Sequence, residues 1–379
     1  MVFVQQCNTY DEDVILEKVS ELFTCHGGIE KYARPGITVV VKPNIVSKKK
    51  PEEAATTHPS LVWAVCELCR RQGACVVVAE SPGGMYEKAL LKGQYRVSGI
   101  EDAASRAGAE LNYDLSVTEI DNPGAKNLKK LKVITPLAKA DVIINIAKLK
   151  THGMMVYTGA VKNMFGAIAG LEKAEYHFNM SEYSDFADCI IDIHNSVKPT
   201  LNILDAVVGM HKDGPTAGEP IEIGAILSGE DAYEVDMVGM DIINCNPSRV
   251  PIFRQAFERQ LVCANVGGID VQGDQIKCPK FVVKYNDEMK RLHYVDGILG
   301  KFLTKIMKPR PVFHKNKCRG CGECVRSCPA KVIRLDENKK AVVDLGGCIR
   351  CFCCQELCPF IAVEIKKPLI NKIVVRKRK

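Results

Sequence analysis

The stretches CRGCGECVRSCP at residues 318–329 and CIRCFCCQELCP at residues 348–359 decide the fold of the C-terminal part of the chain. Each follows the pattern C-x2-C-x2-C-x3-C-P, and the first cysteines of the two copies are 30 residues apart. Three thiolates from one tight loop can hold three corners of an iron–sulfur cubane, so the fourth thiolate must come from elsewhere. The repeated motif therefore predicts two [4Fe–4S] clusters held by eight cysteines.

The two motifs are expected to exchange their fourth cysteines, as they do in two-cluster ferredoxins. One predicted cluster then takes Cys318, Cys321, Cys324 and Cys358, and the other takes Cys348, Cys351, Cys354 and Cys328. A zinc site would need four thiolates only and does not use this spacing. Cys353, which is next to a predicted ligand, is expected to be a packed cysteine rather than a ninth ligand. The segment 332–343 alternates apolar residues around a polar turn and predicts a hairpin over the clusters.

Upstream of the motifs, strand patterns rich in Val and Ile alternate with helical patterns. Strands are expected at 37–42, 75–79, 141–147 and 201–208, and helices at 59–72, 100–107, 159–171 and 232–243. Such alternation is typical of an α/β fold with a mostly parallel sheet and helices on both faces. The cysteine-rich end predicts an additional small α+β ferredoxin-like iron–sulfur domain.

The chain of 379 residues is long enough for two domains. We expect an α/β domain at 1–300, a two-cluster domain at 311–367 and a basic tail at 368–379. Residues 244–310 have mixed patterning and could connect the domains or complete the large one. No apolar run is long enough to cross a bilayer, and the N-terminus lacks the features of a secretory signal, so we expect a cytoplasmic protein.

Charge is divided unevenly along the chain. Residues 301–379 contain 20 Lys and Arg against 6 Asp and Glu, whereas the whole chain has a net charge of only +7. A basic electron-transfer domain would attract an acidic redox carrier, such as a ferredoxin or flavodoxin. The alternative is a solvated basic face or a patch that contacts the acidic large domain. The basic tail is expected to be solvated, and no nucleic-acid partner is predicted.

Polar residues follow four of the expected strands, at 42–44, 80–84, 148–153 and 211–214. The carboxyl ends of parallel strands converge on the ligand crevice, so these segments together favour a binding site. The densest is KLKTH at 148–152, followed by TGAVKN at 158–163 at the start of an expected helix. Free N–H groups at a helix N-terminus favour an anion. No dinucleotide-binding or P-loop glycine motif is present.

We therefore predict a substrate with a phosphate or carboxylate group. Lys148, Lys150 and Lys162 would be its charge partners, and His152 would be the proton donor. In the alternative interpretation, Lys162 is an exposed helix residue and His152 is a hydrogen-bonded loop residue.

The segments VKPN at 41–44, VAESP at 78–82, KLKTH at 148–152 and TGAVKNMFG at 158–166 resemble domain-of-unknown-function family 362. The resemblance extends over about residues 1–250. Members of that family often carry a bacterial-type two-cluster ferredoxin domain at the C-terminus and are common in anaerobic bacteria and archaea. The resemblance implies the same architecture here and emphasises eight residues without giving them roles: Lys42, Asn44, Glu80, Lys148, Lys150, His152, Lys162 and Asn163.

The leading functional prediction is a ferredoxin-linked reductase that passes low-potential electrons from an acidic carrier to an anionic substrate or cofactor. His152, Lys150 and Lys162 are the predicted catalytic residues. The predicted substrate-binding residues are Lys42, Asn44, Glu80, Lys148 and Asn163. Two alternatives remain open: a non-catalytic electron-transfer or activation subunit that docks another enzyme, and a redox-sensing binding protein.

Overall fold

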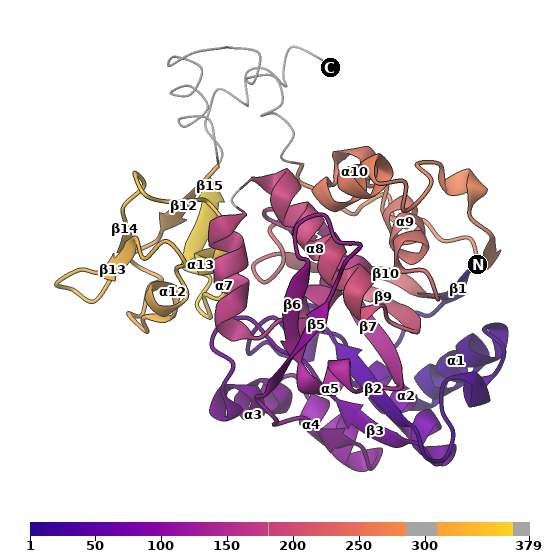
Figure 1. Ribbon diagram of the computed structural model, residues 1–379. Coiled ribbons are helices and arrows are strands. Elements are labelled where there is room, and N and C mark those ends of the chain that lie inside the picture. The colour runs from indigo at the N-terminus through magenta and orange to yellow at the C-terminus, as the bar shows by residue number, and fades with distance from the viewer. Residues whose placement is uncertain (181, 286–308, 367–379) are drawn as a thin grey trace.

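The computed structural model describes residues 1–180, 182–285 and 309–366, and the C-terminal domain lies beside a larger N-terminal domain (Figure 1). Within these residues the large domain is built on a nine-stranded sheet of order β11-β1-β10-β9-β7-β2-β3-β4, with β8 paired to β7. The strands are β1 Val2–Gln6, β2 Thr38–Pro43, β3 Cys75–Val78, β4 Glu110–Leu111, β7 Val142–His152, β8 Val156–Thr158, β9 Leu201–His211, β10 Glu219–Gly229 and β11 Val271–Gly273.

The sheet is mixed but mostly parallel. Strands β4, β3, β2, β7 and β9 form a continuous parallel set. Strand β10 is antiparallel to both β9 and β1, β8 is antiparallel to β7, and β11 is parallel to β1. The predicted α/β fold class is confirmed, and the carboxyl ends of β2, β3 and β7 meet at one edge of the sheet.

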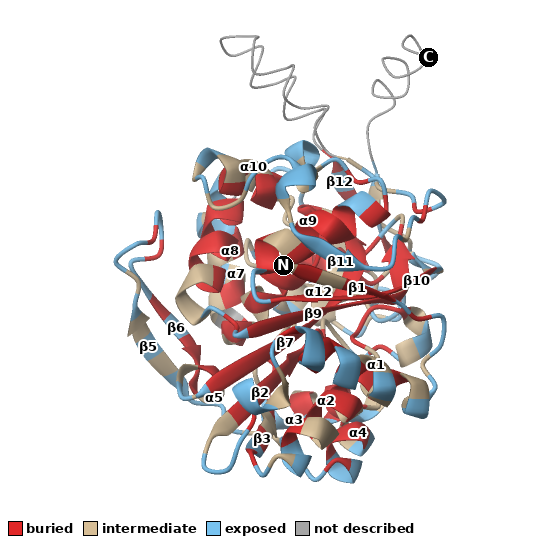
Figure 2. Cartoon of the chain, turned by 90° about the vertical axis from the view of Figure 1, so that its right-hand side faces the viewer, coloured by how far each residue is buried: buried red, intermediate tan, exposed pale blue. Residues whose placement is uncertain are grey.

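Helices cover both faces of this sheet (Figures 1 and 2). Because side chains alternate between faces along a strand, Ile144 and Ile146 of β7 share one core with Val19, whereas Leu149 shares another core with Val235. The first face carries α1 Glu12–Cys25, α2 Pro59–Arg71, α3 Lys88–Val97 and α4 Ile100–Arg106. The second carries α6 Ala160–Asn163, α8 Tyr183–Val197, α9 Ala232–Ile242 and α10 Pro251–Glu258. The α7 helix, Gly170–Asn179, lies beside α8, and α5 is Thr135–Ala138. A separate hairpin pairs β5 Val117–Asp121 with β6 Lys130–Ile134.

Two predicted elements differ from the structure. The strand expected to end at 147 continues to His152, so KLKTH is the buried end of β7 and not a loop. The helix expected at 159–171 is interrupted: α6 passes into a 3-10 turn, Met164–Ala167, then Ile168 bridges to Val133, and α7 begins at Gly170. A Cβ atom at Gly170 would lie 2.6 Å from the backbone nitrogen of Tyr86. Close approach to the neighbouring loop therefore breaks the helix.

Residues 244–285 belong to the large domain. They supply α10 to its core and β11 to the edge of its sheet. The remainder of the unassigned segment, 286–308, and the predicted tail lie outside the described residues.

The small domain has two short antiparallel pairs and two short helices. The pairs are β12 Arg310–Phe313 with β15 Val363–Lys366, and β13 Ile333–Leu335 with β14 Ala341–Val343. The helices are α12 Glu323–Arg326 and α13 Cys353–Glu356. The expected hairpin at 332–343 is confirmed. In the parts of the chain that the structure describes, no helix is long and apolar enough to cross a membrane.

Candidate active site and cluster-binding cavities

The eight motif cysteines lie around two small cavities in the C-terminal domain. The first quartet, Cys318, Cys321, Cys324 and Cys358, lines one cavity. The second quartet, Cys328, Cys348, Cys351 and Cys354, lines the other. Each cavity thus receives three cysteines from one motif and one from the other, which is the grouping that the motif spacing predicts.

The chemistry of each cavity suits an iron–sulfur cluster. Four soft sulfur donors converge in mostly apolar surroundings. Backbone N–H groups point at two of the sulfurs: Ala341 N is 3.4 Å from Cys318 Sγ, and Ala362 N is 3.3 Å from Cys358 Sγ. Such donors stabilise the charge on ligand sulfurs. These residues fit a bound cluster.

A third cavity, of about 120 Å³, lies between the two domains. Six of the eight predicted site residues line it: Asn44, Glu80, Lys150, His152, Lys162 and Asn163. Residues of α7 and of the small domain complete the walls, and the polar ones are Lys173, His177, Arg326, Ser327, Cys353 and Glu356. We call this space the interdomain cavity.

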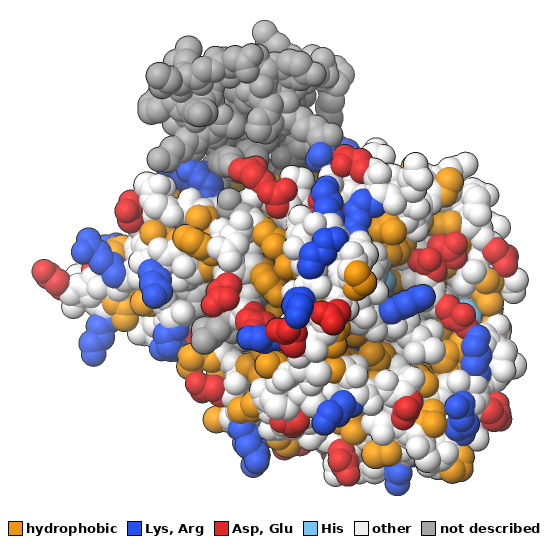
Figure 3. Space-filling view, in the orientation of Figure 1, with side chains coloured by type: hydrophobic (Ala, Val, Ile, Leu, Met, Phe, Trp, Pro, Cys, Tyr) orange, Lys and Arg blue, Asp and Glu red, His pale blue; other side chains and the backbone are white. Residues whose placement is uncertain are grey.

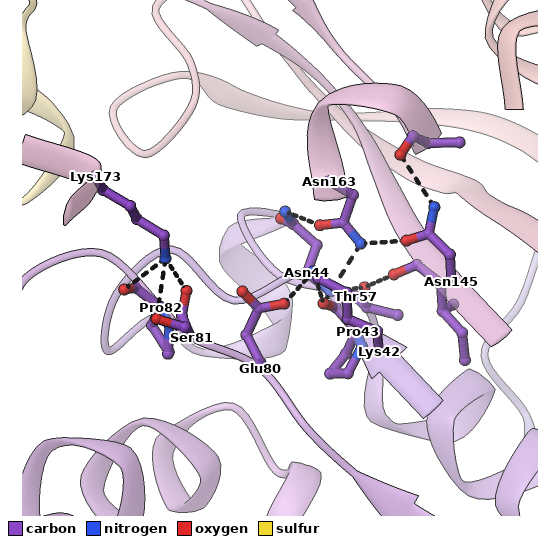
Figure 4. A network of polar contacts seen from close by, with 12 residues as sticks. Lys42, Pro43, Asn44, Thr57, Glu80, Ser81, Pro82, Asn145, Asn163 and Lys173 are labelled. Atoms are coloured by element: carbon purple, nitrogen blue, oxygen red, sulfur yellow. Dashed lines mark hydrogen bonds and ion pairs between the residues drawn. The ribbon is translucent and has the colours of Figure 1, made fainter. Parts of the chain in front are cut away.

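Lys148 and Lys42 do not line the interdomain cavity, contrary to expectation. Lys148 is buried and donates to Asp205 Oδ2 at 2.9 Å and to the hydroxyl of Tyr10 at 2.8 Å. Lys42 forms a buried ion pair with Glu80 (Figure 4). Both ammonium groups are used inside the fold, because a buried charge needs a partner of opposite sign. Lys42 thus neutralises Glu80, which does line the cavity.

A chain of buried amides forms the floor of the cavity (Figure 4). Asn44 Nδ2 donates to Asn163 Oδ1 at 2.7 Å, and Asn163 Nδ2 donates to Asn145 Oδ1 at 2.7 Å. Lys150 Nζ donates to Asn44 Oδ1 and to the carbonyl of Ala55, both at 2.6 Å. Burial lowers the pKa of Lys150 well below its usual range. Asn44 of this chain therefore holds a buried amino group whose protonated form an anion in the cavity would stabilise.

His152 and Glu356 face each other across the domain boundary. The Nδ1 atom of His152 accepts the backbone N–H groups of Met154 at 3.0 Å and Met155 at 3.1 Å. A neutral ring must then carry its proton on Nε2, which lies 3.0 Å from Glu356 Oε1. Burial lowers the pKa of His152, as does nearby Lys162. Burial alone would raise the pKa of Glu356, but His152 and Lys162 together lower it to about 2.

Lys162 is the least satisfied cation of the cavity. No hydrogen bond or ion pair holds its Nζ among the described residues, and that atom lies 5.9 Å from the centre of the Phe165 ring. Burial lowers the pKa of Lys162, whereas Glu356 raises it. Its ammonium group is available to a ligand.

Two cavity residues on α7, Lys173 and His177, were not predicted. Lys173 donates to the carbonyl of Pro82 at 3.1 Å and to Ser81, and burial lowers its pKa to about 7 (Figure 4). His177 Nδ1 is buried without a hydrogen-bond partner in the described residues, and burial lowers the pKa of this ring to about 3. The two residues are four apart, so they share one helix face. This spacing of four residues is the sequence pattern by which the two residues could have been found.

The N-terminus of α6 is already occupied. Asp236 accepts the N–H of Ala160 at 2.6 Å and that of Val161 at 3.0 Å. A Cβ atom at Gly159 would collide with the same carboxylate. The expectation that these N–H groups bind an anion is therefore wrong.

The fourth predicted segment, 211–214, and Thr216 just after it contact the small domain; 211–214 does not line the cavity, whereas the adjacent Pro215 does. Gln355 Nε2 donates to the carbonyl of Asp213 at 3.1 Å, and Thr216 Oγ1 donates to the carbonyl of Glu356 at 2.9 Å. Gln355 and Glu356 both belong to α13.

The short helix α13 also separates two cavities. Cys353 is buried and lines both the second quartet's cavity and the interdomain cavity. The cysteine expected to be merely packed is therefore the shared wall between them.

Comparison with protein families matches two models to the chain. A domain of unknown function, DUF362, matches residues 39–241, and a 4Fe–4S dicluster domain matches residues 310–359. The chain belongs to the DUF362 family. In this DUF362 protein the C-terminal domain is a ferredoxin-like 4Fe–4S domain of the kind used in electron transfer.

Several proteins are similar to parts of this DUF362 protein. A thylakoid-associated protein of Synechocystis sp. is 26% identical over 251 residues, which cover 66% of this chain and 76% of that protein. One polypeptide of the H2:CoB-CoM heterodisulfide,ferredoxin reductase of Methanothermobacter thermautotrophicus is 29% identical over 28% of this chain, which corresponds to 21% of that polypeptide. The lactate racemase apoprotein from Thermoanaerobacterium thermosaccharolyticum has 12% identity and a TM-score of 0.43, over 63% of this chain and 56% of the racemase chain.

Proposed function

We propose that this protein is an iron–sulfur oxidoreductase that uses electrons from an acidic carrier to reduce a small anionic substrate in the interdomain cavity. The two quartets would each hold one [4Fe–4S] cluster, with the ligands assigned above. Clusters of this kind supply single electrons at low potential when bound.

One observation carries this proposal: Cys353 belongs to the wall of the second quartet's cavity and to the wall of a cationic cavity. A ligand in the interdomain cavity would therefore lie next to a redox centre. A protein that only relays electrons to another enzyme has no need for a polar, partly enclosed space at that place.

The charge of the cavity favours an anion. Four cations line it, Lys150, Lys162, Lys173 and Arg326, against two carboxylates, Glu80 and Glu356, and Glu80 already has Lys42 as its partner. Lys162 would bind the anion directly, and Lys150 would approach it from the amide floor. An anion supplies the opposite charge that both buried lysines lack, and so it would raise the pKa of each.

His152 would donate a hydrogen bond to the substrate during reduction. Its Nε2–H faces the interdomain cavity beside Glu356, while its Nδ1 is fixed by two backbone N–H groups. The ring therefore cannot change tautomer or take up a second proton without losing those hydrogen bonds, so it would act as a neutral donor through Nε2. Glu356 would orient the ring.

The first test is ligand binding by anaerobically purified protein. Titration calorimetry with sulfate, phosphate, acetate and malonate should find at least one saturable anion. Lys162→Met should weaken its binding about 10- to 100-fold, because a charged hydrogen bond contributes about 1.5–3 kcal/mol. Lys139→Met, which removes an exposed lysine outside the cavity, should leave the affinity unchanged.

Iron analysis and mass spectrometry of small molecules released on denaturation complete this test. About eight irons per chain are expected from two clusters. Eight irons with no bound anion, and no affinity for any of the four probes, would overturn the reductase proposal in favour of the electron-transfer subunit.

A further inference from the structure

The two cysteine quartets differ in their access to solvent. Cys321 of the first quartet is exposed, and Phe360 and Leu335, which line the same cavity, are 43% and 37% exposed. In the second quartet Cys354 is buried and the other three cysteines are half-buried, so none is exposed, and buried Phe352 lines that cavity; each quartet has one buried cysteine, which is Cys318 in the first. The first quartet therefore faces outward.

The quartets also differ in their distance from the interdomain cavity. The second quartet's cavity shares Cys353 with it. Among the described residues, none lines both the first quartet's cavity and the interdomain cavity. The domain thus has an outward side at the first quartet and an inward side at the second.

Basic side chains surround the outward side. Arg319 lines the first cavity, and Lys339 contacts the neighbouring Gly320; both are exposed, and neither has a carboxylate within ion-pair distance in the described part of the chain. Lys340 Nζ donates to the carbonyl of Cys318 at 2.7 Å. Lys and Arg side chains also gather on the small domain around the β13–β14 hairpin (Figure 3).

The nearby carboxylates are mostly neutralised. Glu323, which also lines the first cavity, lies 2.8 Å from Arg326, and Asp336 lies 3.0 Å from Lys315. Residues 309–366 as a whole contain eleven Lys and Arg against six Asp and Glu. An excess of positive charge around an exposed apolar centre is complementary to an acidic protein surface.

We infer that this surface, formed by Arg319, Leu335, Lys339 and Phe360 and here named the outer face, docks an acidic single-electron carrier protein. Phe360 and Leu335 would form the apolar centre of the contact, and the basic side chains would steer the carrier into place. In each encounter the carrier is oxidised by one electron and this protein is reduced by one. The inference rests on the electron-transfer part of the proposed function and is independent of the substrate.

Direct binding of an acidic [2Fe–2S] ferredoxin to the cluster-loaded protein tests the outer face. Affinity would be measured by surface plasmon resonance at 20 mM and 300 mM NaCl. The wild-type protein should bind more tightly at the lower salt concentration, because charge attraction is screened by salt. Arg319→Glu combined with Lys339→Glu should weaken binding at 20 mM at least tenfold and remove most of the salt dependence.

A matched charge reversal on the large domain provides the control. Lys92→Glu combined with Lys139→Glu changes the net charge equally at positions away from the outer face and should leave the affinity within about twofold. Phe360→Ala, at a largely exposed site, should weaken binding several-fold without a change of charge.

Iron content, measured on the same preparations, shows whether each variant is intact. Equal binding by the wild-type protein and the Arg319/Lys339 variant would overturn the inference, and so would equal weakening by the control pair. If the wild-type protein binds the carrier but none of the small anions, the outer face stands and the substrate proposal fails.

Discussion

Lys173 links the charge of the interdomain cavity to pH. Burial lowers the pKa of its ammonium group to about 7, whereas Arg at the same position would stay protonated. As the pH rises from 6 to 8, Lys173 loses its proton and the cavity loses one positive charge. We expect the affinity for sulfate, whose own charge is constant in this range, to fall up to about tenfold.

The Lys173→Arg variant should make this affinity nearly independent of pH. Titration calorimetry at pH 6, 7 and 8 on both proteins measures the effect, with Lys139→Arg as a control that should keep the wild-type profile. A wild-type profile that is already flat, or an unchanged slope in Lys173→Arg, would contradict the assignment to this residue.

For single residues, the sequence predicted which side chains belong to the site better than it predicted which groups surround them. Lys148, Lys150 and His152 follow one another at alternate positions, and all three were assigned to one loop and one ligand. In the structure Lys148 forms an ion pair with Asp205, and of the three residues Lys150 and His152 line the cavity. The partner of Lys148 is 57 residues away in sequence. A local pattern contains no information about a partner on another strand.

Among the elements, α6 shows how a buried carboxylate stabilises a helix of four residues. Asp236 accepts two N–H groups at its start, and burial raises the pKa of this carboxyl to about 7. Since the carboxyl is protonated more readily in the folded protein than in the unfolded chain, its contribution to stability is largest below about pH 4. It declines by up to about 4 kcal/mol as the pH rises to about 7.

Asp236→Asn removes this titration. The variant should be less stable than the wild type by about 1–3 kcal/mol at pH 5, because one N–H group loses its acceptor. The difference should shrink at pH 8, where the wild-type carboxylate is charged and buried. Urea midpoints at the two pH values measure this.

Asp231→Asn, which changes an exposed N-cap residue of α9, is the control. It should change the midpoint little, since Asn caps helices as well as Asp. If Asp236→Asn lowers the stability equally at both pH values, the titration of Asp236 does not contribute to the stability of the folded protein.

Elements with a regular apolar period were predictable, and the interrupted one was not. The boundaries of α2, β3 and α9 differ from the predicted ranges by one residue or less at each end. The helix expected at 159–171 failed because Gly166 and Gly170 approach the loops that carry Glu80 and Tyr86. Such contacts depend on the assembled sheet, so a helical pattern in the sequence could not reveal them.

For the whole molecule, polar contacts between described residues join the two domains, among them the hydrogen bonds of Thr216 and Gln355 and the His152–Glu356 pair. Thr216→Val combined with Gln355→Leu would remove two hydrogen bonds between them. We expect amide hydrogen exchange of the segments 82–84 and 355–357 to become about 5- to 100-fold faster, as two bonds contribute about 1–3 kcal/mol together.

Hydrogen-exchange mass spectrometry would measure this, with Thr118→Val on the separate β5–β6 hairpin as control. Thr118 bonds only within its own neighbourhood, to Thr135 at 3.1 Å, so the interface should not respond to its loss. Unchanged protection of 82–84 and 355–357 in the double variant would show that the remaining contacts, such as His152 with Glu356 and Leu357 against Gly83, suffice to hold the domains together.

The interdomain cavity as a whole could not be predicted from the sequence. The sequence predicted two domains, the pairing of cysteines and one wall of the cavity. It did not predict that Arg326, Cys353 and Glu356 form the opposite wall, because each stands inside a cysteine motif and was interpreted only as part of it.

The helix α13 places two different demands on the same few residues. Between Cys351 and Cys358 the chain must keep its cysteines in register, and it must also present Cys353 and Glu356 to the large domain. Replacing the C-terminal domain by a free-standing ferredoxin would preserve the motif and lose the wall. We therefore expect the two domains to change together in evolution, so that a substitution in one wall of the cavity is matched by a substitution in the other.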